Sequence, residues 1–99
     1  MLIEKLEKFG LSTKEAKVYL SLLELGTSVV SDVSKKAQTN RSTAYVLLES
    51  LAKHGLVSIS ERRNVRLYTP APPERILQLA EEAVRKYTEL VGVGYSLLP

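Results

Sequence analysis

Apolar residues in the first half of the chain recur at intervals of three and four, which predicts helices. A short amphipathic helix is expected before Gly10. Ser12 and Glu15 follow with the spacing of a capping box, in which each side chain caps the backbone of the other. The second helix should therefore begin just after Ser12 and end at Gly26, which suits a left-handed stop.

A short β-branched segment over residues 27–30 is suited to an extended conformation, and Ser31 is expected to cap a further short helix. Residues 38–40 form a three-residue polar connection. Asn40 is a good N-cap for the next helix, which should run from 41 to 53. The predicted buried stripe of that helix consists of Ala44, Leu47, Leu48 and Leu51.

The period changes to two after Gly55. Residues 56–60 and 65–69 read as two strands, joined by a turn over 62–64, so a β-hairpin with a basic tip is expected. Prolines follow, and a final helix should run from 73 to 91. Its apolar residues at spacings of four and three resemble a coiled-coil seam of nearly two heptads, formed by Ile76, Ala80, Ala83, Tyr87 and Leu90.

The predicted fold class is therefore mainly α with a small β-hairpin. Helix, short extended segment, helix, tight turn, helix and hairpin is the order of a winged helix-turn-helix. We expect this unit over residues 1–72, followed by a C-terminal helix and short tail over 73–99. Because the unit has enough helices to close its own core, the final helix is expected to serve dimerisation.

Charge is unevenly distributed along the chain, whose net charge is +3. Residues 35–66 contain seven basic and two acidic residues, a net +5, whereas the remainder carries −2. A basic middle in a slightly acidic frame indicates a polyanionic partner.

Composition excludes several classes of function. The chain has no cysteine and a single histidine, His54, so disulfides, Cys-based metal sites and His-rich metal sites are not expected. No nucleophile with a base and an orienting group falls in a plausible cleft, and no phosphate-binding glycine loop is present, so neither an enzyme nor a cofactor is predicted. The longest apolar run, residues 44–48, is too short to span a membrane, and a cytoplasmic, nucleoid-associated protein is expected.

The helix from 41 to 53 is the candidate reading helix, because its N-terminus combines short hydrogen-bonding side chains with the positive end of a helix dipole. The hairpin tip lies where a wing would touch DNA backbone or minor groove. The candidate DNA-binding residues are Lys35, Lys36, Thr39, Asn40, Arg41, Ser42, Thr43, Tyr45, Val46, Arg62, Arg63, Asn64 and Arg66.

Structural alternatives stay open for some of these residues. The arginines at 62, 63 and 66 are also what a solvated hairpin edge uses against aggregation. Tyr45 suits packing as well as groove contact, and Lys35 and Lys36 suit plain solvation. His54, at a helix C-terminus, favours a structural role.

The chain also resembles a known family. The stretch LSTKEAKVYLSLLEL at 11–25, the pair Arg41-Ser42 followed by Tyr45, the stretch LAKHGLV at 51–57, and Tyr68 followed by PPE at 72–74 are similar to the TrmB-like winged-helix transcriptional regulators of archaea and bacteria. The resemblance covers about residues 2–80 and implies sequence-specific binding of duplex DNA as a dimer. Residues 38–40 depart from the usual pattern, although Asn40 keeps the capping function.

Larger TrmB-like proteins carry a C-terminal domain that binds sugars. This chain ends before such a domain would fit, so sugar sensing is not carried over and a small-molecule effector remains unknown. The predicted function is a homodimeric regulator that binds an inverted repeat in double-stranded DNA. The alternative is a winged-helix protein-interaction module or scaffold without specific DNA binding.

Overall fold

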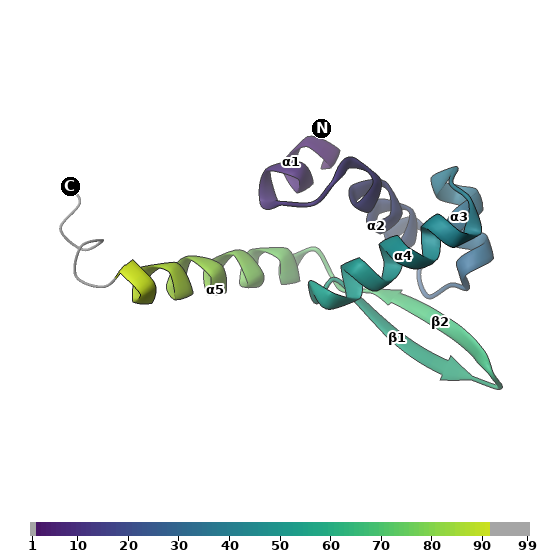
Figure 1. Cartoon of the computed structure of the whole chain (residues 1–99). Helices are drawn as coiled ribbons and strands as arrows, with labels where there is room; N and C mark the ends of the chain where they lie inside the picture. The colour runs from purple at the N-terminus through teal and green to yellow at the C-terminus, as the bar shows by residue number, and fades with distance from the viewer. Residues whose placement is uncertain (1, 92–99) are drawn as a thin grey trace.

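The computed structural model describes residues 2–91, without the side chains of nine of them: Leu2, Lys5, Phe9, Ala80, Ala83, Tyr87, Thr88, Leu90 and Val91. Within this range the elements follow in the order α1 (Leu2–Phe9), α2 (Thr13–Leu25), α3 (Val30–Ala37), α4 (Arg41–Lys53), β1 (Val57–Arg62), β2 (Val65–Pro70) and α5 (Glu74–Val91). Figure 1 shows α2, α3 and α4 grouped together, with the hairpin beside α4. The winged helix-turn-helix expected from the sequence is confirmed.

The helices begin where local capping and burial agree. The Ser12 hydroxyl accepts a hydrogen bond from the Glu15 amide and the Glu15 side chain accepts one from the Ser12 amide, which confirms the capping box. Ser31 does not cap α3, because that helix begins one residue earlier, at Val30. The Val30 side chain is buried in the core, so packing rather than a polar cap determines this helix start.

Gly26 and Gly55 end helices as the sequence predicts, but the backbone at each differs in detail from the expectation. Gly26 has a positive φ of 78° as expected, but its ψ of −157° is not that of a left-handed helix. Gly55, with φ 79°, ends α4, and the Leu56 amide returns to the Leu51 carbonyl at 3.0 Å. Leu56 is therefore part of the helix end, and the strand begins at Val57.

The hairpin is antiparallel, with Val57 opposite Pro70 and Arg62 opposite Val65. Its turn contains only Arg63 and Asn64, not the three residues expected, because Arg62 still pairs in the ladder. Near its base, β2 also pairs with Ser28, whose amide and carbonyl both bond Tyr68 at 2.9 Å. The base of the hairpin is thus tied to the segment before α3.

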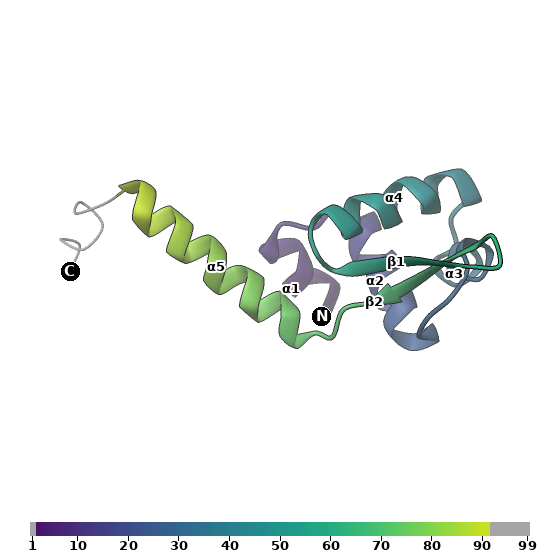
Figure 2. The same ribbon diagram turned by 90° about the horizontal axis from the view of Figure 1, so that it is seen from below.

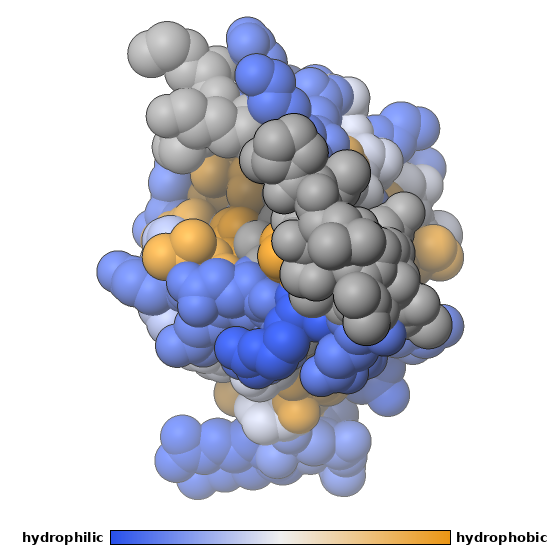
Figure 3. Space-filling model, turned by 90° about the vertical axis from the view of Figure 1, so that its left-hand side faces the viewer, coloured by the Kyte–Doolittle hydropathy of each residue, from blue (hydrophilic) through white to orange (hydrophobic). Residues whose placement is uncertain are grey.

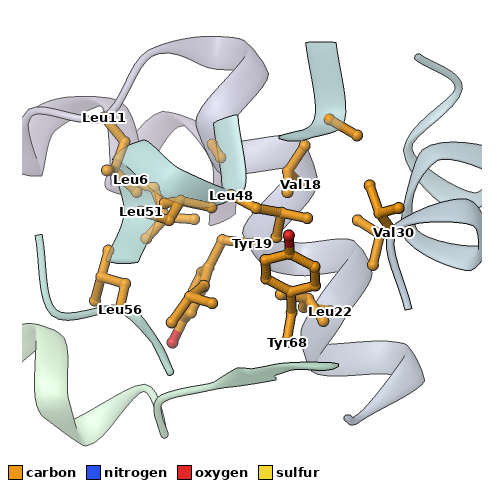
Figure 4. Packing of buried hydrophobic residues seen from close by; sticks show 14 residues of the cluster. Leu6, Leu11, Val18, Tyr19, Leu22, Val30, Leu48, Leu51, Leu56 and Tyr68 are labelled. Atoms are coloured by element: carbon orange, nitrogen blue, oxygen red, sulfur yellow. The ribbon is translucent and has the colours of Figure 1, made fainter. Parts of the chain in front are cut away.

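One core holds these elements together. Figure 4 shows Tyr68, Leu22, Val18 and Leu48 among the buried side chains that α2, α4 and the hairpin contribute. The buried hydrophobic residues are Leu6, Leu11, Ala16, Val18, Tyr19, Leu22, Val30, Val33, Ala44, Leu48, Leu51, Leu56, Val57 and Tyr68. Leu47, expected in this stripe, is only half-buried.

Helix α5 extends away from this core in two perpendicular views (Figures 1 and 2), and the molecule measures 52 × 29 × 21 Å. Among the described side chains of α5, Ile76 and Leu79 in its first turns pack against the core. Leu77, between them in sequence, and Val84 are exposed. The face seen in Figure 3 is mostly hydrophilic, and its hydrophobic residues lie in separate areas.

Candidate nucleic-acid interface

The turn before α4 is held by its own backbone. Gln38 adopts a left-handed conformation (φ 56°, ψ 47°), and the Thr39 amide donates to the Ser34 carbonyl at 3.0 Å. Asn40 is extended, and its side-chain oxygen accepts from the Thr43 amide at 2.7 Å. The capping role expected for Asn40 is confirmed, and the first turn of α4 is fixed at its start.

Helix α4 turns one face to the core and the other outward. Ala44, Leu48 and Leu51 are fully buried, whereas Val46 is 69% and Tyr45 38% exposed. Other candidate residues around the first turn divide in the same way: Asn40, Arg41 and Ser42 are exposed, and Thr39 and Thr43 are half-buried. The outer face thus rests on a rigid base, and it carries donors, acceptors and apolar groups that can meet base edges.

A shallow groove of about 520 Å³ continues along this outer face. It is lined by Tyr45, Val46, Glu49, Ser50 and Lys53. The last three were not among the sequence candidates. Glu49 and Ser50 lie three or four residues after Tyr45 and Val46, and Lys53 lies three and four after Ser50 and Glu49, a spacing that places all of them on the same face.

Tyr45 is in contact with the hairpin as well as with the outer surface. Its ring meets that of Tyr68 edge to face, with centroids 6.3 Å apart and planes at 82°. The guanidinium of Arg66 lies 6.0 Å from the centroid of the Tyr45 ring. The Tyr45 ring therefore packs on the hairpin while remaining partly exposed, and its contact with the groove of DNA stays a prediction.

Arg66 also pairs with Glu49, and the two charged groups are 3.6 Å apart. The pKa of Arg66 is raised, chiefly by the nearby Tyr68 hydroxyl and to a smaller extent by Glu49. Burial raises the pKa of the Tyr68 hydroxyl, an effect that Arg66 opposes. That hydroxyl is buried and has no hydrogen-bond partner of normal geometry among the described residues. Arg66 is thus directed toward α4, unlike the arginines at the tip.

The tip of the hairpin is exposed and narrow. Arg62 ends β1, and the two turn residues Arg63 and Asn64 have positive φ values of 53° and 65°. Positive φ at both positions is typical of the two-residue hairpin turn that matches strand twist. Asn tolerates this conformation, but a bulky residue such as Arg63 rarely adopts it. The tip therefore keeps an arginine where propensity alone would favour glycine or asparagine.

The two lysines before the turn differ in their surroundings. Lys35 and Lys36 both lie exposed in the last turn of α3. The ammonium of Lys36 pairs with Glu24 at 2.9 Å, which offsets its charge. Lys35 is consequently the better candidate for a contact with phosphate.

In the part of the chain that the structure describes, no three His, Cys, Asp or Glu side chains are grouped so that they could hold a metal ion. Over residues 2–91, no helix combines the length and the apolar character needed to cross a bilayer.

Comparison with known proteins identifies the family. The profile described as "Sugar-specific transcriptional regulator TrmB" matches residues 6–74. The chain belongs to the TrmB family. This confirms the family resemblance read from the sequence. Because the family consists of transcriptional regulators, it also agrees with the expectation that the chain is not an enzyme.

Two curated members of the TrmB family are similar in sequence. The sugar-sensing transcriptional regulator TrmBL1 of Pyrococcus furiosus is 41% identical over 81 residues, which cover 82% of this chain and 24% of TrmBL1. The DNA-binding transcriptional repressor TrmBL2 of Thermococcus kodakarensis is 32% identical over 72 residues, covering 73% of this chain and 27% of TrmBL2. The chain thus spans about a quarter of the length of these relatives.

A solved structure of TrmBL2 has the same fold. That protein is described as an archaeal chromatin protein with a novel mode of DNA binding. It superposes with a TM-score of 0.80 over 91% of this chain and 35% of its own, at 22% identity. The TrmB fold therefore covers nearly all of the chain.

Proposed function

We propose that this TrmB-family chain is a sequence-specific regulator of transcription that binds double-stranded DNA as a homodimer. The observation that carries the proposal is the first turn of α4, where Arg41, Ser42 and Tyr45 are presented outward from a capped and buried base. In this mode α4 enters the major groove. The net +5 of residues 35–66 and the DNA-binding relatives support the same partner.

Four further candidates act on the DNA backbone in this proposal. Arg62, Arg63 and Asn64 at the exposed tip grip the flanking phosphates, and Lys35 adds a contact beside the turn. Such contacts supply affinity and orientation but little sequence discrimination. Chromosomal DNA as partner implies a protein associated with the nucleoid.

Dimerisation is assigned to the region 73–99, through the seam of α5 proposed from its spacing. Of its residues, Ile76 already packs partly on its own core, and the side chains of Ala80, Ala83, Tyr87 and Leu90 lie outside the described residues. The exposed Leu77 and Val84 are seven residues apart, on one side of the helix next to this seam. Two-fold pairing of α5 predicts an operator that is an inverted repeat.

A salt titration of duplex binding with footprinting tests this function. If each protomer neutralises about three to five phosphates, the dimer should show a log–log salt slope of roughly −5 to −9, and single-stranded DNA or duplex RNA should bind more weakly. A protected inverted repeat supports the proposal. No binding at low salt overturns DNA binding in favour of the interaction module, and uniform protection of all fragments overturns sequence specificity.

Mutations should separate the residues that contact the DNA backbone from those that recognise bases. Arg62→Ala with Arg63→Ala should weaken binding to every duplex alike and flatten the salt slope by about one or two units. Ser42→Ala should instead reduce discrimination at particular base pairs by about 1–3 kcal/mol. Lys8→Ala, a charge on α1 away from this face, is the matched control. Equal losses of specific and random binding in both sets would contradict the placement of α4.

A further inference from the structure

Arg66 differs from the tip arginines in what surrounds it. Its guanidinium pairs with Glu49 at 3.6 Å and lies 6.0 Å from the centre of the Tyr45 ring. Both partners belong to α4, whereas Arg66 belongs to β2. These two contacts therefore join the hairpin to the outer face of the proposed reading helix.

The positive charge of Arg66 is already paired within the protein. Glu49 offsets it, and a phosphate approaching Arg66 would have to compete with a carboxylate fixed on the neighbouring helix. The planar guanidinium suits simultaneous pairing with a carboxylate and stacking over a ring, which a lysine ammonium cannot reproduce. This geometry favours a bridge within the molecule over a contact with phosphate.

Two residues of the hairpin contact the Tyr45 ring. Tyr68, fully buried in the core, meets the ring in an edge-to-face arrangement, and Arg66 lies over the ring. On β2 these two residues are two apart, so their side chains share a face of the hairpin. Because Tyr68 is anchored in the core, the orientation of Tyr45 is tied to the position of the hairpin base.

We propose that Arg66 is a positioning residue that orients Tyr45 for base reading, with Glu49 as its holder, and that it makes no phosphate contact. This inference rests on the proposed function and removes Arg66 from the group of wing phosphate contacts expected from the sequence. Arg66 then governs specificity, while Arg62 and Arg63 govern grip. Glu49 becomes a determinant of specificity that acts through Arg66.

Conservative variants at two positions test the assignment. Arg66→Lys keeps the charge but loses the planar group, so its salt slope should equal that of wild type while its discrimination between the preferred site and random duplex falls about tenfold. Arg63→Lys, the matched control at the exposed tip, should keep both slope and discrimination. An Arg66→Lys protein that discriminates as wild type does, or an Arg66→Gln protein that flattens the slope as much as Arg63→Gln, overturns the proposal.

A substitution at Glu49 should steepen the salt slope, whereas loss of an arginine flattens it. Glu49→Gln frees Arg66 for phosphate, so binding to random duplex should strengthen, the slope should steepen by about one unit per protomer, and discrimination should fall. In an Arg66→Gln background the same change should leave the slope unaltered, since the released charge is absent. A steepening of equal size in both backgrounds would show that Glu49 acts directly on DNA, and would overturn its role as holder.

A measurement without DNA separates failure of this inference from failure of the proposed function. In the free protein, Arg66→Lys should shift the ring resonances of Tyr45 in an NMR spectrum, and Arg63→Lys should leave them in place. Unchanged Tyr45 resonances in Arg66→Lys overturn the bridge even if wild type binds DNA. Conversely, shifted resonances in a protein that binds no duplex reject the proposed function and leave the bridge standing.

Discussion

The first turn of α4 and the tip of the hairpin carry the two groups of side chains proposed to meet DNA, and they are held in opposite ways. The first turn starts at a side-chain cap on Asn40 and rests on the fully buried Ala44 and Leu48. The tip is two turn residues at the end of a two-stranded ladder, and all of its side chains are exposed.

The difference matches what each contact requires. Hydrogen bonds to base edges discriminate only when donor and acceptor are placed within narrow limits of distance and angle. Attraction between arginine and phosphate falls off slowly with distance and tolerates movement. A fixed first turn is therefore suited to reading, and an exposed tip is sufficient for grip.

The largest expected contrast between the two regions is in packing. Leu48→Ala removes a fully buried side chain beneath α4 and should cost about 2–5 kcal/mol of unfolding free energy. Val65→Ala, next to the tip and 47% exposed, should cost less than about 1 kcal/mol. Denaturant unfolding of both variants measures this, and equal costs would show that the hairpin end is packed as firmly as α4.

Two asparagines allow a sharper comparison, because they serve different purposes. Asn40→Ala removes a cap, and Asn64→Ala replaces a residue that tolerates positive φ through local hydrogen bonding by one that lacks this tolerance, so each should cost about 1 kcal/mol. The rescues should differ: serine restores stability at 40, where a side-chain acceptor is needed, and glycine at 64, where the backbone conformation matters. Thermal unfolding of these four variants and of Asn64→Ser checks this. Full rescue by serine at 64 would contradict the proposed role of the turn.

Two buried tyrosines test how far the fixed region extends into the hairpin base. The Tyr19 hydroxyl donates to the Ala71 carbonyl at 2.8 Å, so Tyr19→Phe should cost roughly 0.5–1.5 kcal/mol. Tyr68→Phe removes a hydroxyl with no partner of normal geometry and should leave stability unchanged or slightly higher. Calorimetry of both proteins gives the comparison. A large loss in Tyr68→Phe would mean that Arg66 bonds that hydroxyl in solution.

The smallest effect concerns Glu15, which joins the start of α2 to α4. Burial raises the pKa of its carboxyl group, but hydrogen bonds from Ser12 and Ser50 outweigh burial, so the pKa lies below its ordinary value of 4.5. Because the folded pKa is the lower one, the resulting stability is present above about pH 4.5 and is lost as pH falls through the folded value. Glu15→Gln should thus be less stable than wild type by about 0.3–1 kcal/mol at pH 7.

That deficit should shrink as the pH is lowered below 4.5. Thermal melts of wild type and Glu15→Gln between pH 3 and 7 measure it. Ser50→Ala is the matched control, since it removes a hydrogen bond to the same carboxylate without changing its charge. A deficit that stays constant with pH would show that the ionised form of Glu15 contributes nothing.

Sequence signals predicted several features that have a local cause. The capping pair Ser12 and Glu15, the cap Asn40 and the helix stop Gly55 each depend on neighbours within a few residues, and each is where the sequence places it. The predicted start of α3 was wrong because burial of Val30, a tertiary effect, determines where this helix begins. Local rules could not anticipate that competition.

The residues of the candidate interface were easier to identify from the sequence than to sort by their roles. Its charged and polar residues were recognised from composition and caps, but Arg66 was grouped with Arg62 and Arg63 because all three are basic and close in sequence. The packing of the hairpin on α4 shows that Arg66 faces Tyr45 and Glu49 on another element. The period-two spacing of Arg66 and the buried Tyr68 was the available signal that these two share a face.

Because the turn of the hairpin has only two residues, the length of its strands determines how far the wing extends. With no slack in the turn, the reach of the tip is set by strand length alone, at about 3.4 Å for each residue added to both strands. Adding a single residue to each strand would also turn the arginines to the opposite side of the sheet, so workable lengths differ in steps of two residues. Each such step moves the tip by about 6.8 Å, close to the axial rise of two base pairs. In the proposed DNA-binding mode, lengthening this hairpin would therefore change which phosphate the tip reaches without altering α4.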